Sequence, residues 1–306
     1  MKRLIRNLVN NSEFGLVINW KFHCQNKWVS AYGRFLAEAI IHEFNPIIIS
    51  SQLDYELNKC RLKHIISFEP GWASPKIRYD ITINCIKMVM YSDPHMQPIE
   101  RRCYFDNNAF DYVLSMYDKP FFKHFKNFPK EKFVHFPWAV PDQFVSTHDI
   151  VVRTNEVVIF GARASDAYDI RNWCREQEGI TNYDFSGVEN KKLKDEDYYL
   201  WLQQFDAVVA AGSSLPDYDL VTPKYFEIVA AGALLIGQYC KDLGALGFDQ
   251  TNALIFTKQD FVEKVNDFKK NPDKYLEIRK RGRDLIIERH KLSDRIKLIK
   301  GLILKK

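Results

Sequence analysis

The chain has 306 residues, 46% of them hydrophobic, and a net charge of +5, values typical of about two globular domains with well-buried cores. It contains no run of about 18 apolar residues and no apolar leader at its start, so neither a membrane span nor a secretory signal is predicted. The six cysteines are scattered without a C-x-x-C pair, which excludes a zinc or disulfide framework and indicates reduced thiols in the cytoplasm.

The first half alternates short apolar runs with helical or polar stretches, which predicts an α/β fold with a mostly parallel sheet. A helix is expected over 29–44. The predicted strands and their connections are GLVINW (15–20), NPIIISS (45–51), HIISFEPGW (64–72), INCIKMVMYSDPH (83–95), DYVLSMYD (111–118) and KFVHFPWAV (132–140). Because no G-x-G-x-x-G follows the first strand, this half is not expected to bind a dinucleotide.

Pro137, Pro141 and the polar stretch 147–156 indicate a domain boundary near residue 150. The domains are therefore expected to be 1–150 and 151–306. The second half resumes the alternation with strands predicted at 156–161, 182–187 and 206–214 and helices at 166–177 and 195–205. Two α/β halves joined by a hinge predict a ligand-binding cleft between them.

The basic segment 269–306 ends the chain. It holds fourteen Lys/Arg and five Asp/Glu, a charge of +9, so the rest of the chain carries −4. Such a segment could contact an anionic membrane surface or nucleic acid. The simplest interpretation is that it forms the solvated face of a helix.

The most informative stretch is DLVTPKYFEIVAAG (219–232). Thr222 suits the N-cap of a helix, Pro223 its first position and Gly232 its left-handed end. The free N–H groups of the first turn and the charge of Lys224 together predict an anion site. Glu227, one turn later, can accept hydrogen bonds from hydroxyls. The alternative is an ordinary capped helix with Glu227 on the solvated surface.

Lys-x-Phe-Glu-Ile-x-Ala-x-Gly in this stretch resembles the nucleotide-binding signature of GT-B glycosyltransferases of group 1, and most closely that of the CgeB-like subgroup. Asp219 precedes Glu227 by eight positions, as the first acid does in the Glu-x7-Glu motif of the retaining members. The resemblance implies two Rossmann-like domains facing across a cleft, with a last helix from about residue 290 that packs Ile296, Ile299, Leu302 and Ile303 onto the first domain.

The same resemblance implies transfer of a sugar from a nucleotide-diphosphate sugar, with a UDP-sugar as the expected donor, and with retention and without a metal or other cofactor. It places the donor nucleotide against Gly161, Arg163, Ser213, Thr222, Lys224 and Glu227, with Arg171 as a second arginine. Gly161 lets the backbone approach a ligand, and Arg163 can bind phosphate oxygens through two N–H groups. Asp217-Tyr-Asp219 spells D-x-D, which we interpret as a coincidence because it lies in a loop.

Catalytic roles are expected for Asp93, His95 and Asp219, although Asp93 could simply begin a turn. His23 and Glu69 are alternative groups at the same predicted sheet edge. The acceptor stays open between a glycan and a modified base in phage-type DNA, and the oligomeric state is not predicted. A non-catalytic protein that binds a sugar nucleotide or nucleic acid on the same fold is the competing hypothesis.

Overall fold

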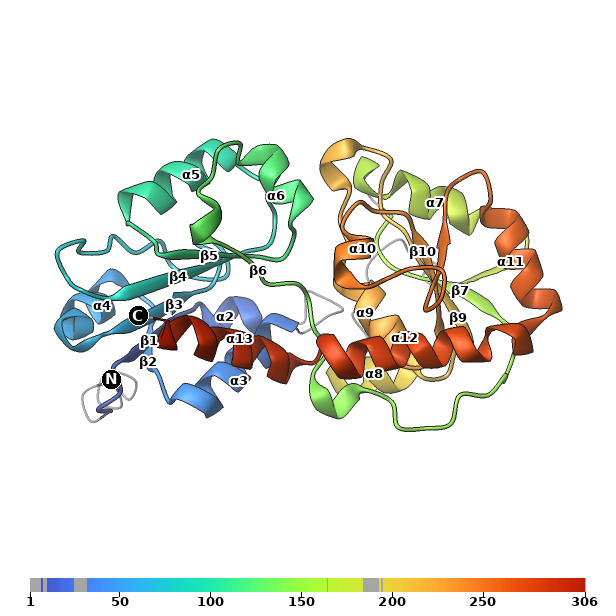
Figure 1. Cartoon of the computed structure of the whole chain (residues 1–306), viewed down its shortest axis with the longest axis horizontal. Helices are drawn as coiled ribbons and strands as arrows, with labels where there is room; N and C mark the ends of the chain where they lie inside the picture. Colours follow the sequence, from blue (N-terminus) through green and yellow to red (C-terminus); the bar gives the residue numbers. More distant parts are fainter. Residues whose placement is uncertain are drawn as a thin grey trace. The chain divides into compact units, whose positions relative to one another are not determined.

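The structure, a computed structural model, describes Asn7 and residues 10–24, 32–163, 165–183, 193 and 195–305. Within these residues the chain forms two compact α/β units (Figure 1). The first unit takes in the described residues up to Cys24, Gly33–Pro137 and the segment from Arg295 onward, and the second takes in Tyr32 and the described residues of Trp138–Asp294. The units therefore divide somewhat before residue 150.

The first unit is built on a sheet in which every neighbouring pair of described strands is parallel, as the alternating sequence predicts. The strand order is β2-β1-β3-β4-β5-β6. The strands are β1 (Phe14–Val17), β2 (Ile47–Ile49), β3 (His64–Ser67), β4 (Ile86–Tyr91), β5 (Tyr112–Ser115) and β6 (Phe133–His135).

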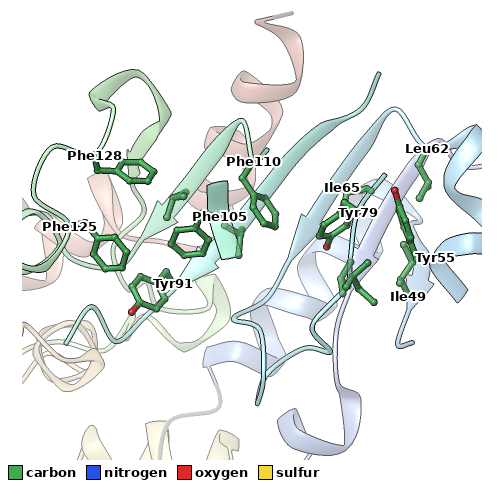
Figure 2. Packing of buried hydrophobic residues seen from close by; sticks show 14 of the residues in the cluster. Ile49, Tyr55, Leu62, Ile65, Tyr79, Tyr91, Phe105, Phe110, Phe125 and Phe128 are labelled. Atoms are coloured by element: carbon green, nitrogen blue, oxygen red, sulfur yellow. The ribbon is translucent and has the colours of Figure 1, made fainter. Parts of the chain in front are cut away.

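Helices cover both faces of this sheet (Figure 1). They are α2 (Trp20–His23), α3 (Tyr32–Phe44), α4 (Gln52–Asn58), α5 (Pro98–Asn107) and α6 (Lys119–His124), joined by the end of α13 (Leu292–Leu304). Figure 2 shows Tyr91 of β4 among the phenyl rings of Phe105 and Phe125, with ring centroids 5.6 and 5.4 Å away. These edge-on contacts fix the end of β4, where the predicted Asp93 and His95 begin their loop.

The second unit is built on a sheet of order β11-β10-β9-β7-β8, again parallel at every described pair. Its strands are β7 (Val157–Ile159), β8 (Ile180–Asn182), β9 (Ala207–Ala210), β10 (Leu234–Gln238) and β11 (Leu254–Phe256). Its helices are α7 (Asp169–Arg175), α8 (Asp195–Leu202), α9 (Pro223–Ala230), α10 (Leu243–Leu246), α11 (Phe261–Lys270) and α12 (Leu276–Arg289). The strand predicted at 182–187 lies mostly outside the described residues.

Helix α9 begins and ends where its capping residues predict. Pro223 is its first residue, Thr222 stands at the N-cap, and Gly232 has a φ of +78°. The Thr222 side chain makes no capping hydrogen bond, so the N-cap prediction is right in position and wrong in mechanism. Helices α2, α4, α5, α6 and α10 were not predicted from the sequence.

The last helix buries three of the four apolar side chains that the sequence predicts to pack. Ile296, Ile299 and Leu302 are buried, whereas Ile303 is half-buried and Leu304 is exposed. All six cysteines lie in the described residues and are free. No helix of the described residues is long and apolar enough to cross a membrane.

A buried ion pair fixes α9 and β9 relative to each other. Asp206, just before β9, lies 3.1 Å from the Nη1 atom of Arg279 on α12, and both side chains are fully buried. The other Asp206 oxygen accepts the backbone N–H groups of residues 153–155. Arg279 Nε donates to the carbonyl of Gly232, at the end of α9, over 2.9 Å. The pair thus holds the start of β9, the end of α9 and the incoming chain in one place.

Replacing Arg279 with Met should destabilise the protein strongly, because it removes the fully buried partner of the Asp206 carboxylate and leaves only the longer, partly exposed contact with Arg153, 3.9 Å away. We expect a loss of about 3–5 kcal/mol in the free energy of unfolding, measured with urea. The control is Arg281→Met on the same helix, whose exposed pair with Glu277 should contribute less than about 1 kcal/mol. Equal losses in the two variants would contradict this assignment.

Candidate functional site

The carboxyl ends of β7 and β9 form the topological switch point of the second sheet. Strand β7 pairs with β8 on one side and with β9 on the other, so the chain leaves this edge in opposite directions. Such points are the usual ligand sites of open α/β sheets. Gly161 follows β7 closely, Ser213 follows β9, and Lys224 stands on α9, the next helix.

Gly161 is the residue around which this site is arranged. Its φ is +113°, a backbone conformation that side chains other than glycine rarely adopt. A Cβ atom at this position would lie 2.8 Å from Lys224 Nζ and 3.2 Å from Arg171 Nη1. The missing side chain therefore leaves room for two cationic groups to reach the same stretch of backbone.

Lys224 reaches back from α9 to the end of β7. Its Nζ donates to the carbonyl of Phe160 over 2.7 Å and lies 4.0 Å from the centre of the Phe160 ring. A cation in the first turn of a helix is repelled by the helix dipole. The carbonyl and the ring offset that repulsion and fix the position of the ammonium group.

Two arginines of α7 meet Lys224 at the same point. Arg171 donates from Nε to the carbonyl of Ala211 over 2.8 Å and from Nη1 to that of Ala162 over 3.3 Å. Arg175 Nη2 donates to the carbonyl of Gly161. We call Gly161, Arg171, Arg175 and Lys224 the cationic corner. These backbone carbonyls orient the three cationic side chains at the end of β7.

Arg175 was missed by the sequence analysis, and Arg171 was only a second candidate. The signal for Arg175 is its spacing: four residues after Arg171 on a helix, its side chain extends from the same face. Arg163, the predicted phosphate ligand, is half-buried, and its Nε has no hydrogen-bond partner among the described residues.

The remaining predicted donor residues line the connections after β9. Ser213 is buried, and its Oγ accepts the N–H group of Leu215 over 3.1 Å. Asp219 accepts the backbone N–H of Lys241 over 3.2 Å. Among the described residues, no group of three His, Cys, Asp or Glu side chains could hold a metal ion.

Glu227 is not a solvated surface residue. Only 2% of its surface is exposed, and its Oε2 accepts a hydrogen bond from the Tyr198 hydroxyl over 2.9 Å. The surface interpretation of Glu227 is therefore wrong. A contact between this carboxylate and a ribose stays a prediction, and the tyrosine shows that the carboxylate does accept hydroxyl donors.

In the first unit, a buried polar cluster joins the loops that follow β3 and β4. Glu69 accepts hydrogen bonds through Oε2 from the N–H and the hydroxyl of Ser92, and Arg101 Nη2 lies 3.9 Å from Oε1. Ser92 Oγ also lies 3.4 Å from an oxygen of Asp93. Asp93 begins a turn, since its carbonyl accepts the N–H of Met96 over 2.9 Å.

The carboxyl groups of this cluster titrate above their ordinary range. Burial, followed by the nearby Asp93 carboxylate, raises the pKa of Glu69, although Ser92 and Arg101 act in the opposite direction. Burial also raises the pKa of Asp93. His95 is half-buried in the same loop, and His23 has a backbone partner, the carbonyl of Ala73, 3.1 Å from its Nε2. Catalytic roles for Asp93, His95 and Asp219 stay predictions.

A model of the glycosyl transferase-like family matches residues 147–301, slightly more than half of the chain. The chain belongs to this family. The matched residues include the whole cationic corner and α9, so the family and the switch point indicate the same part of the second unit. The finer resemblance to the CgeB-like subgroup stays a prediction. A comparison with curated proteins gave no significant match.

Solved structures of glycosyltransferases share the fold of this family member. Anabaena HepE in complex with UDP and glucose has a TM-score of 0.64 at 12% identity, covering 96% of this chain and 100% of HepE. A glycosyltransferase from Rickettsia africae has a TM-score of 0.59 at 10% identity, covering 96% and 98%. TarM has a TM-score of 0.54 at 12% identity, and the alignment covers 90% of this chain but 58% of TarM. These similarities show the fold, which is GT-B, as predicted.

Replacing Gly161 with Ala should strain the backbone and displace Lys224. We expect a loss of about 1–3 kcal/mol in the free energy of unfolding and weaker binding of pyrophosphate, measured by calorimetry. Gly212→Ala is the control, because a Cβ there meets no atom within 4 Å. If Gly161→Ala behaves like Gly212→Ala in both measurements, the cationic corner does not depend on Gly161.

Replacing Glu69 with Gln should change how stability depends on pH. The folded-state pKa of Glu69 is raised, so the stability from its protonated form is present at low pH and lost as the pH rises through that pKa. The substituted glutamine keeps an acceptor oxygen for Ser92 but cannot ionise. Relative to the native protein, the variant should therefore melt at a higher temperature at about pH 8 than it does at about pH 4. A difference that stays constant with pH would contradict the raised pKa.

Proposed function

We propose that this chain transfers a sugar from a nucleotide-diphosphate sugar, with a UDP-sugar as the donor, to a hydroxyl group of an acceptor. The observation that carries the proposal is the cationic corner at the switch point of the second sheet. Three cationic side chains gathered at one strand end favour binding of a multiply charged anion, and a diphosphate is such an anion.

The chemistry of glycosyl transfer needs this charge. The bond between the anomeric carbon and the diphosphate oxygen breaks, and its electron pair stays on the diphosphate. A new bond forms from the acceptor oxygen to the same carbon. Preorganised positive groups stabilise the charge that develops on the leaving diphosphate. Lys224, Arg171 and Arg175 are already oriented by their carbonyl partners and need little rearrangement.

Retention at the anomeric carbon is part of the proposal, on the strength of Asp219 at the first place of the Glu-x7-Glu-like spacing. In a retaining reaction of this kind the acceptor proton passes to the departing diphosphate oxygen, and no enzyme base is needed. An inverting reaction needs a general base opposite the leaving group. Asp93 and His95 are the groups that would then serve, which makes the product anomer informative about their roles.

The choice of uridine is supported by the similar HepE, whose structures contain UDP and UDP-glucose. The donor should be identified by a thermal-shift comparison of uridine, guanosine, adenosine and cytidine diphosphates, because a ligand in excess over its dissociation constant raises the melting temperature.

Replacing Lys224 with Met should weaken UDP binding by about 10- to 100-fold, the value of one or two charge-assisted hydrogen bonds to phosphate. Calorimetry measures the change. The control is Lys264→Met, since Lys264 also donates to a strand carbonyl, that of Ile255, but on β11 and not at the switch point beside β7. The control should bind UDP like the native protein.

Catalysis is tested by the release of UDP from UDP-glucose, UDP-galactose and UDP-N-acetylglucosamine, with and without glycan and DNA acceptors. We expect the native protein to release UDP from at least one of these sugars. Lys224→Met should reduce both this release and the binding of UDP. Tight UDP binding without release from any of these sugars would favour the non-catalytic binding protein instead.

A further inference from the structure

Tyr198 of α8 is a buried tyrosine that contacts a carboxylate of the neighbouring helix α9. The two helices pack beside each other in the second unit (Figure 1). The Tyr198 hydroxyl donates to Oε2 of Glu227 over 2.9 Å, and 1% and 2% of the two residues' surfaces are exposed. A hydrogen bond to a charged group is roughly twice as strong as one between neutral groups. This bond therefore fixes the direction of the Glu227 carboxylate.

The Tyr198 hydroxyl keeps its proton and acts as a donor. Burial, followed by the nearby Glu227 carboxylate, raises the pKa of Tyr198 well above its ordinary value. A carboxylate has about four acceptor positions on its two oxygens, so one hydroxyl donor does not fill it. The bond from Tyr198 thus orients the Glu227 carboxylate and is compatible with a further hydroxyl donor from a ligand.

The ring of Tyr198 lies against the residue that holds Lys224. The centroids of the Tyr198 and Phe160 rings are 6.2 Å apart, at an interplanar angle of 75°. Trp201, one turn later on α8, packs edge-on against the same Phe160 ring with centroids 4.8 Å apart. Phe160 holds Lys224 through its carbonyl and its ring face. Tyr198 therefore supports Glu227 through its hydroxyl and Lys224 through its ring.

The spacing of Lys224 and Glu227 fits a nucleotide. They stand three positions apart on α9, so their side chains extend from the same face of the helix. In a ribonucleoside diphosphate the ribose ring is joined to the phosphate through the C5′ methylene group alone. A diphosphate bound at the cationic corner would therefore bring its ribose hydroxyls to the next turn of α9, where Glu227 stands.

We propose that Tyr198 is a positioning residue that fixes the Glu227 carboxylate to accept the 2′-hydroxyl of the donor, so that the chain selects ribonucleoside over 2′-deoxyribonucleoside diphosphates. A site built around a hydroxyl donor rejects the analogue that lacks it, because a buried acceptor is then left unpaired. The inference rests on the proposed function, because it requires a nucleoside diphosphate at the cationic corner.

The test is calorimetry with UDP, 2′-deoxy-UDP and pyrophosphate. The native protein should prefer UDP over 2′-deoxy-UDP by about tenfold or more. Tyr198→Phe keeps the ring and removes the hydroxyl, so this preference should fall to about threefold or less while pyrophosphate binds as before. Tyr198→Leu also removes the ring beside Phe160, so it should in addition weaken pyrophosphate binding by about threefold or more.

Tyr275→Phe is the matched control. Tyr275 is buried in the same unit, and its hydroxyl also donates to a carboxylate, that of Asp267 on α11. This variant should keep the native preference for UDP. Glu227→Gln leaves Tyr198 unchanged and should lower the preference, which keeps the inference testable if Tyr198→Phe fails to fold. Adding Tyr198→Phe to Glu227→Gln should cause no further loss of preference, since Tyr198 acts through Glu227.

The same titrations separate this inference from the proposed function. If the native protein binds neither UDP nor pyrophosphate, the proposed function itself fails. UDP binding without a preference over 2′-deoxy-UDP, or a preference that Tyr198→Phe or Glu227→Gln leaves intact, would overturn the inference alone. An equal loss of affinity for all three ligands in Tyr198→Phe would also overturn it, because a purely structural role gives that result.

Discussion

The second unit depends on one local constraint: the backbone at Gly161 must turn with a positive φ and without a side chain. Only then can Lys224 reach the carbonyl of Phe160 while Arg171 and Arg175 reach those beside it. The positive groups are thus ordered before any ligand binds. This arrangement explains why a lysine is tolerated in the first turn of α9, where the helix dipole opposes it.

Capping and spacing allowed much of this region to be predicted from the sequence. Thr222-Pro223 and Gly232 mark the ends of α9 by local backbone preferences, and strand alternation predicts both parallel sheets. The partners of the site residues depend on the tertiary fold. Lys224 and Phe160 lie 64 positions apart, and Arg101 meets Pro70 only because α5 packs beside the loop after β3. No local pattern encodes such pairs, so Arg101 and the burial of Glu227 by Tyr198 were not predicted.

The two units use the same sheet geometry with opposite chemistry. At the second switch point, cations are held on backbone carbonyls. At the first, the buried Glu69 carboxyl group lies 3.9 Å from the buried guanidinium of Arg101. In the proposed reaction the second switch point stabilises the leaving diphosphate. The buried pair of Asp206 and Arg279 contributes indirectly, by fixing the elements that carry the cationic corner.

The cationic corner makes the diphosphate, and not the base, the main source of donor affinity in the proposed complex. The most direct measurement is therefore a calorimetric comparison of UDP, UMP and uridine with the native protein at low salt. Affinity should fall steeply from UDP to UMP and again to uridine, by about tenfold or more per step, and the UDP affinity should decrease as salt is added. Equal affinities for the three ligands, independent of salt, would contradict the role assigned to the cationic corner.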